Sequence, residues 1–325
     1  MSAVKHVAIL TSGGDAPGMN AATRAAVRTA LVHRLQVSGV MRGFAGLIAG
    51  DFTPIDARSV SNIIQRGGTI LKTSRTLEFL DPERRAVAAA NLSAAAIDGV
   101  VAIGGDGTFR GLHALVSEHG IRCIGVPGTI DNDLFGTDFT IGFDTAVNTA
   151  LESIDKIRDT AASLDRIFFI EVMGRNSGAI ALSVGVSGGA EEILVPEVPV
   201  DIEGLCSLFA VGRQKGKTSF IIVVAEGAFE GGAHAVAEAV SERTGIDYRV
   251  SILGHVQRGG SPTSLDRELG TLLGGAAIDA LVAGETDKMA GVECGRVKLV
   301  PLAETWERRK PANLDLLKVA EITAT

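Results

Sequence analysis

A glycine-rich loop at 104–108 has the composition of a phosphate-binding turn. Its sequence is GGDGT, and it follows the apolar run 100–103. Glycine lets backbone N–H groups approach phosphate oxygens, and the N-terminus of a following helix favours negative charge. Asp106 would repel a bare phosphate but suits a site in which Mg²⁺ lies between the two. The plainer alternative is a tight turn with an Asp cap, and the loop has neither the Lys of a Walker A motif nor GxGxxG spacing.

A second loop of this kind covers 13–20, with the sequence GGDAPGMN after the apolar run 7–10. It is equally typical of a plain turn with proline at a helix start and of a second backbone cradle for the same phosphates.

The loop 127–133, PGTIDND, places two carboxylates and a hydroxyl close together. Asp131 and Asp133 are two residues apart, so their repulsion can raise the pKa of one of them. A carboxylate near an acceptor hydroxyl can take its proton during phosphoryl transfer. Taken alone, such a motif is more often an Asx-rich surface turn.

Arginines with suitable chemistry for phosphate lie in or beside loops, namely Arg75, Arg166, Arg175, Arg249 and Arg258. The guanidinium fork binds phosphate oxygens in pairs and stabilises charge on a transferring phosphoryl group. A single arginine is usually a solvated surface charge. His255 is as often structural as functional. It lies three residues before Arg258 in GHVQRGGSP, and glycines flank the pair, so we expect a phosphate site there.

The elements that must position these loops follow a repeated pattern. Uninterrupted apolar runs, typical of strands buried on both faces, occur at 7–10, 100–103, 123–126, 167–172 and 220–225. Helical periodicity occurs at 21–32, 84–96, 144–162 and 276–282, with Asp144 or Thr145 as the expected cap of the third helix. The pattern predicts parallel α/β sheets, whose ligands gather at the carboxyl ends of the strands. We therefore expect the five loops after these strands to converge on one crevice.

Composition excludes several other classes. The 325 residues carry a net charge of −7, which disfavours a nucleic-acid coat or a binder of anionic membranes. Aromatic residues make up 4%, too few for a base-stacking RNA binder. The three widely spaced cysteines favour a reducing compartment, and we expect a cytoplasmic protein. No signal peptide or apolar stretch of about 18 residues is evident.

Eight motifs in order resemble the bacterial 6-phosphofructokinases, over about residues 6–285: SGGDAPGMNA, RGGTILKTSR, GGDGT, PGTIDND, GFDTA, EVMGRNSG, AEGA and LGHVQRGGSP. The resemblance implies two Rossmann-like α/β domains with parallel sheets and the active site in the cleft between them. We expect a nucleotide domain at 1–140 that also receives part of the C-terminal helical cover, a sugar-phosphate domain at 141–300 and a segment 301–325 that packs back on the first domain. The implied reaction transfers phosphate from MgATP to the 1-hydroxyl of fructose 6-phosphate.

The resemblance also implies residue roles. The expected nucleotide-binding residues are Gly13, Arg75, Thr76, Gly105, Asp106, Gly107 and Thr108, and Asp106 would hold Mg²⁺. The expected catalytic residues are Asp131 as the base, Arg75, Thr129, Asp133 and Arg175. The expected sugar-phosphate residues are Thr129, Ile130, Asp131, Arg166, Met173, Gly174, Arg175, Glu226, Arg249, His255, Val256, Gln257 and Arg258. A homotetramer is expected, in which Arg166 and Arg249 reach a neighbouring active site.

The choice of phosphoryl donor depends on two positions in the resemblance. Gly107 and Gly128 match ATP users, whereas pyrophosphate users carry Asp and Lys there. The segments GFDTAVNTA and VVAEGA look more like the branch that contains pyrophosphate and mixed-donor members, so that alternative stays open. Phe44, Lys72 and Thr76 differ from the common ATP-site residues, which leaves base preference and affinity undecided.

An effector site for ADP or phosphoenolpyruvate is also implied, with matching residues Arg24, Arg28, Arg158, Glu191, Lys215 and Lys217. One expected arginine is replaced by Ala57, beside Arg58. A lost charge-assisted phosphate contact costs about 1.5–3 kcal/mol. We expect weakened or altered allostery unless Arg58 restores the contact; a sigmoidal substrate curve relieved by ADP would contradict this.

Two rival classes remain. NAD and lipid kinases share a GGDGT loop but lack the PGTIDND, MGR and QRGGSP motifs as a set. A sugar-phosphate sensor without catalysis would need a broken base or metal ligand, whereas Asp131, Asp106 and Arg75 are all present.

Overall fold

The computed structural model describes residues 4–323, which form two compact units. The first unit contains, of the described residues, 4–130 together with 134–145 and 258–310. The second contains 131–133, 146–257 and 311–323. The chain therefore leaves the first unit, builds most of the second, returns to the first, and contributes its last described segment to the second.

A seven-stranded sheet forms the centre of the first unit. Its order is β11 (Arg296–Pro301), β10 (Lys288–Glu293), β5 (Arg122–Pro127), β4 (Gly99–Gly104), β1 (His6–Thr11), β2 (Gln36–Val40) and β3 (Phe52–Pro54). The strands from β10 to β2 are parallel, and the two edge strands β11 and β3 are antiparallel. In the register, Thr11 lies opposite Ile103 and Gly104 opposite Pro127. The loops after β1, β4 and β5 consequently leave the sheet at one edge.

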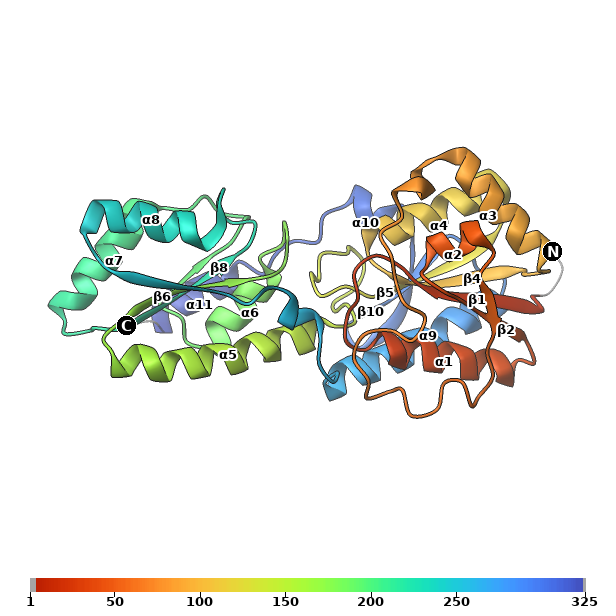
Figure 1. Cartoon of the computed structure of the whole chain (residues 1–325), viewed down its shortest axis with the longest axis horizontal. Coiled ribbons are helices and arrows are strands. Elements are labelled where there is room, and N and C mark those ends of the chain that lie inside the picture. The colour runs from red at the N-terminus through yellow and green to blue at the C-terminus, as the bar shows by residue number, and fades with distance from the viewer. Residues whose placement is uncertain (1–3, 324–325) are drawn as a thin grey trace. The chain divides into compact units, whose positions relative to one another are not determined.

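Helices cover both faces of this sheet. On one face lie α1 (Met19–Val32) and α9 (Ser264–Val282), and on the other α2 (Phe44–Ala49), α3 (Pro82–Ala94) and α4 (Asp106–His119) (Figure 1). A Cβ on Gly274 of α9 would lie 2.3 Å from the Ala22 carbonyl of α1, so glycine permits the close approach of these helices. The short helices η1 (Leu77–Leu80) and α10 (Glu304–Glu307) complete the unit.

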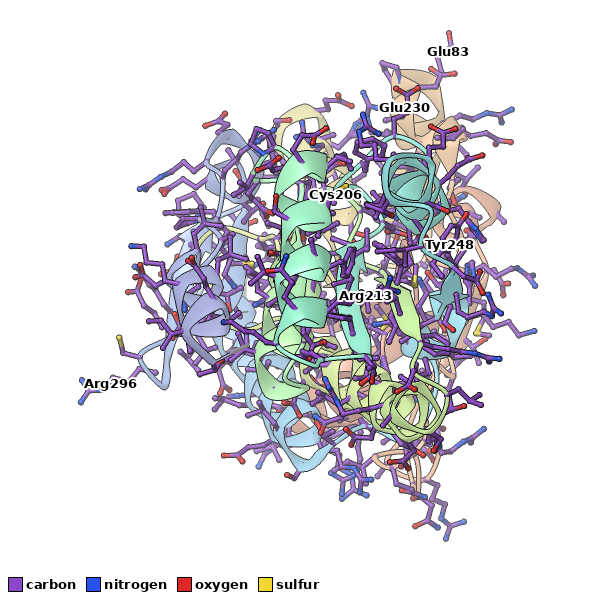
Figure 2. The ribbon with its side chains drawn as sticks, turned by 90° about the vertical axis from the view of Figure 1, so that its left-hand side faces the viewer. Glu83, Cys206, Arg213, Glu230, Tyr248 and Arg296 are labelled. Carbon is purple, nitrogen blue, oxygen red and sulfur yellow. The ribbon has the colours of Figure 1, made fainter. Side chains whose placement is uncertain are left out.

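A parallel four-stranded sheet forms the second unit, in the order β7 (Glu192–Leu194), β8 (Phe220–Ala225), β6 (Ile167–Val172) and β9 (Tyr248–Ile252). One face carries α5 (Phe143–Ser163), α6 (Ala179–Ser187) and α11 (Asp315–Thr323), and the other carries α7 (Ile202–Gln214) and α8 (Gly232–Thr244) (Figure 1). Figure 2 looks onto α7, with Cys206 and Arg213 along it, and shows α8 beside it. The short helix η2 (Gly254–Arg258) follows β9.

The α/β class with two parallel-sheet units is confirmed, and all five predicted apolar runs are strands. The division of the chain differs from the expected 1–140, 141–300 and 301–325. Residues 258–310 complete the first unit, because β10 pairs with β5. The segment 315–323 forms α11, which contacts α6 and β7 in the second unit. The helix expected at 276–282 is the end of the longer α9.

The five polar loops belong to two sheets. Those after β1, β4 and β5 share an edge of the first sheet, whereas those after β6 and β8 share an edge of the second. The cap expected for the helix at 144–162 is also different, because the Thr145 N–H donates to the Asp266 carboxylate of α9 at 2.8 Å.

An ion pair fixes α3 to α4 and gives a stability prediction. The Arg85 guanidinium is 9% exposed. It bonds both Glu118 oxygens, at 2.7 and 2.6 Å, and the carbonyls of Phe79 and Leu80. We expect Arg85→Met to lower the free energy of unfolding by about 1–3 kcal/mol, because the two carbonyls lose their donor while half-exposed Glu118 partly regains water. Urea unfolding measures the change.

The control is Arg84→Met. Arg84 is half-exposed, and its ion pair with Glu78 is long, at 3.9 Å. This variant should therefore change the free energy of unfolding by no more than about 0.5 kcal/mol. The Arg85 hydrogen bond lowers the pKa of Glu118. The contribution of the Glu118 pair is therefore present at neutral pH and is lost as pH falls through that lowered pKa, so the difference between the two variants should become smaller in acid but should not vanish, because the two carbonyls still lack their donor. Equal losses in both variants at neutral pH would contradict the prediction.

Candidate active site

The two glycine loops of the first unit are joined at their base. The Thr108 hydroxyl of α4 donates to the Ser12 carbonyl at 3.2 Å. A Cβ on Gly104 would lie 2.6 Å from the same carbonyl, so this approach requires glycine. Gly105 is the extended residue that precedes α4, and the first N–H groups of a helix have no acceptor within the helix. The Thr108 side chain therefore holds the loops together, while the N-terminus of α4 remains suited to an anion.

The segment 72–76 lies beside Gly13. The Thr73 hydroxyl donates to the Gly13 carbonyl at 2.9 Å, and the Gly13 N–H donates to the Ser74 carbonyl at 3.4 Å. Arg75 is exposed, and the Thr76 hydroxyl bonds that of Ser74 at 2.8 Å. The structure thus brings the expected nucleotide-side residues of three separate loops to one edge of the sheet.

Asp106 stands at the first position of α4 and has an arginine partner that the sequence reasoning missed. Its Oδ1 accepts from the Arg110 Nε at 2.8 Å, and the guanidinium of Arg110 lies 5.0 Å from the ring centre of Trp306. The spacing of four residues on one helix was a visible signal for this pair. Between residues 4 and 323 there is no group of three or more His, Cys, Asp or Glu that could hold a metal ion.

The two glycines that bear on donor choice differ in their surroundings. A Cβ on Gly107 would meet no atom within 4 Å, whereas one on Gly128 would lie 2.8 Å from Ile103 Cγ2 and 3.1 Å from Met19 Cε. Packing alone therefore favours glycine at 128. Gly107 is different, because the space beside it accepts a larger side chain.

Phe44 does not present its ring to a ligand. It is buried, it stacks on Phe79 with ring centres 4.0 Å apart, and it fills the space beside Gly111. Phe44, which differs from the common ATP-site residue, thus belongs to the core between α2, η1 and α4.

The acidic loop after β5 holds its first carboxylate out of water. Asp131 is 4% exposed, and its Oδ2 lies 3.7 Å from the Arg175 Nε. Asn132 has a φ of 48°, a left-handed conformation that asparagine tolerates in tight turns. The Thr129 carbonyl accepts from the Thr140 hydroxyl at 2.6 Å. Ile130 is buried and Asp133 is exposed. A carboxylate in this position can accept the proton of an acceptor hydroxyl.

Glu226 shapes the turn after β6. Its Oε1 accepts the N–H groups of Gly174, at 3.3 Å, and of Arg175, at 2.6 Å. Gly174 has a φ of 143° and Arg175 a φ of 52°, so the turn is strained and depends on such support. Gln257 also supports this turn, because its Oε1 accepts the Met173 N–H at 2.8 Å. Gln257 is fully buried, and its side chain positions this turn.

The residues expected to bind the phosphate group of the sugar differ in their exposure. His255 and Val256 are exposed on η2. Arg258 is 8% exposed, its Nη1 donates to the Asp15 carbonyl at 3.2 Å, and the guanidinium packs against Gly14. Its charge therefore lies beside the glycine loop after β1.

The two arginines expected to reach a neighbouring site lie in the second unit. Arg166 immediately precedes β6 and is half-buried. Arg249 lies within β9, and its Nη1 donates to the Asp247 carboxylate at 2.9 Å and to the Tyr248 carbonyl at 2.7 Å.

Three of the expected effector residues form a charged cluster. Glu191 is largely buried and its Oε1 lies 3.0 Å from the Lys217 Nζ and 3.8 Å from the Arg158 Nη1. Lys215 lines, with Glu191 and Lys217, a cavity of about 830 Å³ between β7, α7 and α11. The remaining two, Arg24 and Arg28, lie on α1 in the first unit.

Comparison with known proteins decides the family. Residues 6–281 match the phosphofructokinase family. The chain belongs to the phosphofructokinase family. It is 58% identical over 321 residues to the ATP-dependent 6-phosphofructokinase 1 of Thermus thermophilus, across 99% of this chain and 100% of that protein. It is 51% identical to the ATP-dependent 6-phosphofructokinase of Cytophaga hutchinsonii, across 98% of this chain and 97% of that protein.

Solved phosphofructokinase structures share this fold. The phosphofructokinase from Saccharomyces cerevisiae aligns with a TM-score of 0.86 and 37% identity over 93% of this chain, which spans 45% of the yeast chain. The pyrophosphate-dependent phosphofructokinase from Marinobacter aquaeolei aligns with a TM-score of 0.84 and 25% identity, over 96% of this chain and 86% of that one. The helices of residues 4–323 include none long and apolar enough to cross a membrane.

Gly227 gives a test of the turn that Glu226 supports. A Cβ on Gly227 would lie 2.0 Å from the Arg175 carbonyl oxygen, a backbone atom that cannot move without the turn. We expect Gly227→Ala to displace residues 174–175 and to weaken fructose 6-phosphate binding at least about 10-fold, with the fold retained. Titration calorimetry measures the affinity, and thermal melting checks the fold.

The matched control is Gly107→Ala in the first unit, where a Cβ meets open space; it should leave fructose 6-phosphate affinity near the wild-type value. Unchanged affinity in Gly227→Ala would show that the turn does not hold the sugar phosphate.

Proposed function

We propose that this chain is an ATP-dependent 6-phosphofructokinase, which transfers the γ-phosphoryl group of ATP to the 1-hydroxyl of fructose 6-phosphate. The observation that carries the proposal is the 58% identity to an ATP-dependent 6-phosphofructokinase along the whole length of both chains. The buried Asp131 beside Arg175, on a loop that the family motif assigns to the acceptor, supports it.

Asp131 is the proposed general base. The sugar hydroxyl oxygen forms a bond to the γ-phosphorus, the bond from that phosphorus to the β–γ bridging oxygen breaks, and ADP leaves. Asp131 receives the hydroxyl proton. Arg175 stabilises the carboxylate before the transfer, and Arg75 stabilises the charge on the moving phosphoryl group. Thr129 and Asp133 assist from the same loop.

On the nucleotide side, backbone groups of Gly13 and of Gly105–Thr108 receive the phosphates, with Arg75 and Thr76 beside them. Magnesium is commonly held by one or two carboxylates together with substrate phosphates and waters. A lone carboxylate at Asp106 fits this pattern, and it is half-exposed at a helix N-terminus. A bound Mg²⁺ would neutralise charge on the nucleotide phosphates.

The sugar phosphate is the proposed ligand of the second unit, with Met173, Gly174, Arg175 and Glu226 at the sugar and His255 at the 6-phosphate. Gln257 positions Met173. Arg258 is proposed to serve the same phosphate, although its guanidinium here bonds the Asp15 carbonyl. Ile130 and Val256 contribute backbone and apolar contacts.

Assembly, control and location complete the proposal. We propose a homotetramer in which Arg166 and Arg249 reach a neighbouring active site. The cluster of Arg158, Glu191 and Lys217 is the proposed effector-binding half from the second unit, with ADP or phosphoenolpyruvate as ligands. A cytoplasmic location is proposed because all three cysteines are free thiols.

Pyrophosphate is the second candidate donor, since a pyrophosphate-dependent relative shares the fold at 25% identity. We expect the wild type to phosphorylate fructose 6-phosphate with ATP and Mg²⁺ and not with pyrophosphate. Gly107→Asp should raise the KM for ATP at least about 10-fold, because the new carboxylate repels the phosphates. Coupled assays with each donor measure both, and Gly107→Ala is the uncharged control. Activity mainly with pyrophosphate would overturn the ATP assignment.

The base assignment predicts a large effect at Asp131. We expect Asp131→Asn to lower kcat about 10²–10⁴-fold while fructose 6-phosphate still binds, because the amide cannot accept the proton. The control is Asp155→Asn, an exposed carboxylate on α5, which should retain full activity. A kcat near the wild-type value in Asp131→Asn would rule out this residue as the base.

A further inference from the structure

A buried carboxylate outside the proposed catalytic groups binds the segment 142–145. Asp266 lies in the first turn of α9 and is 1% exposed. Its Oδ1 accepts the Gly142 N–H at 2.7 Å, and its Oδ2 accepts the Thr145 N–H at 2.8 Å and the Thr145 hydroxyl at 2.5 Å. Three donors from a single short segment thus converge on one side chain.

Removing the Asp266 carboxylate from water carries a cost in free energy. Burial raises the pKa of Asp266, and the hydrogen bonds from Thr145 and Gly142 oppose that effect. A carboxylate in an apolar interior is tolerated only where such bonds compensate the lost water. The Thr145 hydroxyl also accepts the Thr263 N–H at 3.0 Å, which ties the start of α9 to the start of α5.

The segment that Asp266 holds is in contact with the loop after β5. The Ile141 N–H donates to the Pro127 carbonyl at 2.9 Å, and the Thr140 hydroxyl donates to the Thr129 carbonyl at 2.6 Å. A shift of residues 140–145 therefore moves the hydrogen-bond partners of the residues that lead into Asp131.

The same segment is wedged against the glycine loop after β1. A Cβ on Gly142, whose φ is 103°, would lie 2.6 Å from the Ala16 Cβ, and one on Gly18 would lie 2.7 Å from Ile141 Cγ2. The Asp266 backbone carbonyl lies 3.1 Å from that same Gly18 position. Asp266 thus lies where the loop 13–20 packs against the segment 140–145, which in turn bonds the loop 127–133.

We propose that Asp266 is a positioning residue for phosphoryl transfer: through Gly142 and Thr145 it fixes the segment 140–145, and through that segment the loop that carries Thr129. The proposal rests on the proposed kinase function and adds a residue to it. Asp266 itself contacts no substrate. A displacement of about 1 Å in a reacting group can lower the rate about 100-fold, so a small relaxation at Asp266 is sufficient for a large effect.

The primary test is Asp266→Asn, which keeps the shape but replaces one acceptor oxygen by an NH₂ group that faces a donor. We expect kcat to fall about 10–100-fold, with KM for ATP and for fructose 6-phosphate within about 3-fold of wild type. The Gly142 and Thr145 amides should lose hydrogen-exchange protection. The matched control is Asp279→Asn, on the same helix, where the carboxylate is exposed and bonds His33 at 2.7 Å; it should change neither readout.

A second pair of variants keeps the test decisive if Asp266→Asn does not fold. Thr145→Val removes only the hydroxyl that bonds Asp266, and Thr145→Ser retains it. We expect Thr145→Val to lower kcat about 10-fold and Thr145→Ser to restore it. A purely structural role would instead lower the melting temperature of Thr145→Val and leave the kcat of its folded fraction unchanged.

The outcomes separate the two proposals. An active wild type with equally active Asp266→Asn or Thr145→Val would overturn the positioning role alone. A wild type that does not phosphorylate fructose 6-phosphate with either donor would overturn the kinase assignment on which it rests.

Discussion

Parallel pairing of β4 with its neighbours β1 and β5 is the constraint on which the first unit depends. The register carries three loops out at one edge, and the resulting crowding excludes side chains at Gly104 and Gly128. Glycine at these positions has no side chain to pack, and this absence permits the close approach of the neighbouring segments. The N-terminus of α4 and the acidic loop after β5 are consequently held by neighbouring strands, which are among the stiffest supports a protein offers.

In the second unit, carboxylate and amide side chains support the turn after β6. Glu226 and Gln257 each accept backbone N–H groups of the turn after β6, and the turn they hold contains two residues with positive φ. Such conformations persist only where the surroundings fix them. In both units, therefore, the backbone is held in restricted conformations at the ends of strands, which is where a parallel sheet places ligands.

The sequence predicted the fold class and the five central strands because uninterrupted apolar runs before glycine loops have few other structural solutions. It did not predict that β10 completes the first sheet, since pairing with β5 is a contact between distant segments that no local period encodes. Phe44, Arg258 and Gln257 illustrate the same limit at the site. Their residue types do not encode the contacts that the fold gives them: the ring stacks on Phe79, the guanidinium packs on Gly14, and the amide oxygen accepts the Met173 N–H. Asp266 was missed because its partners lie more than a hundred positions away along the chain.

The return of the chain to its first sheet has a consequence for synthesis on the ribosome. The edge of β5 is completed by β10, which is translated after nearly all of the second unit. Until then the nascent first unit carries an unpaired parallel strand edge and lacks α9 over one face, both of which favour association with other chains. The strands of the second sheet are therefore translated before the first sheet is complete, whereas α11, the last helix of the second unit, follows both sheets.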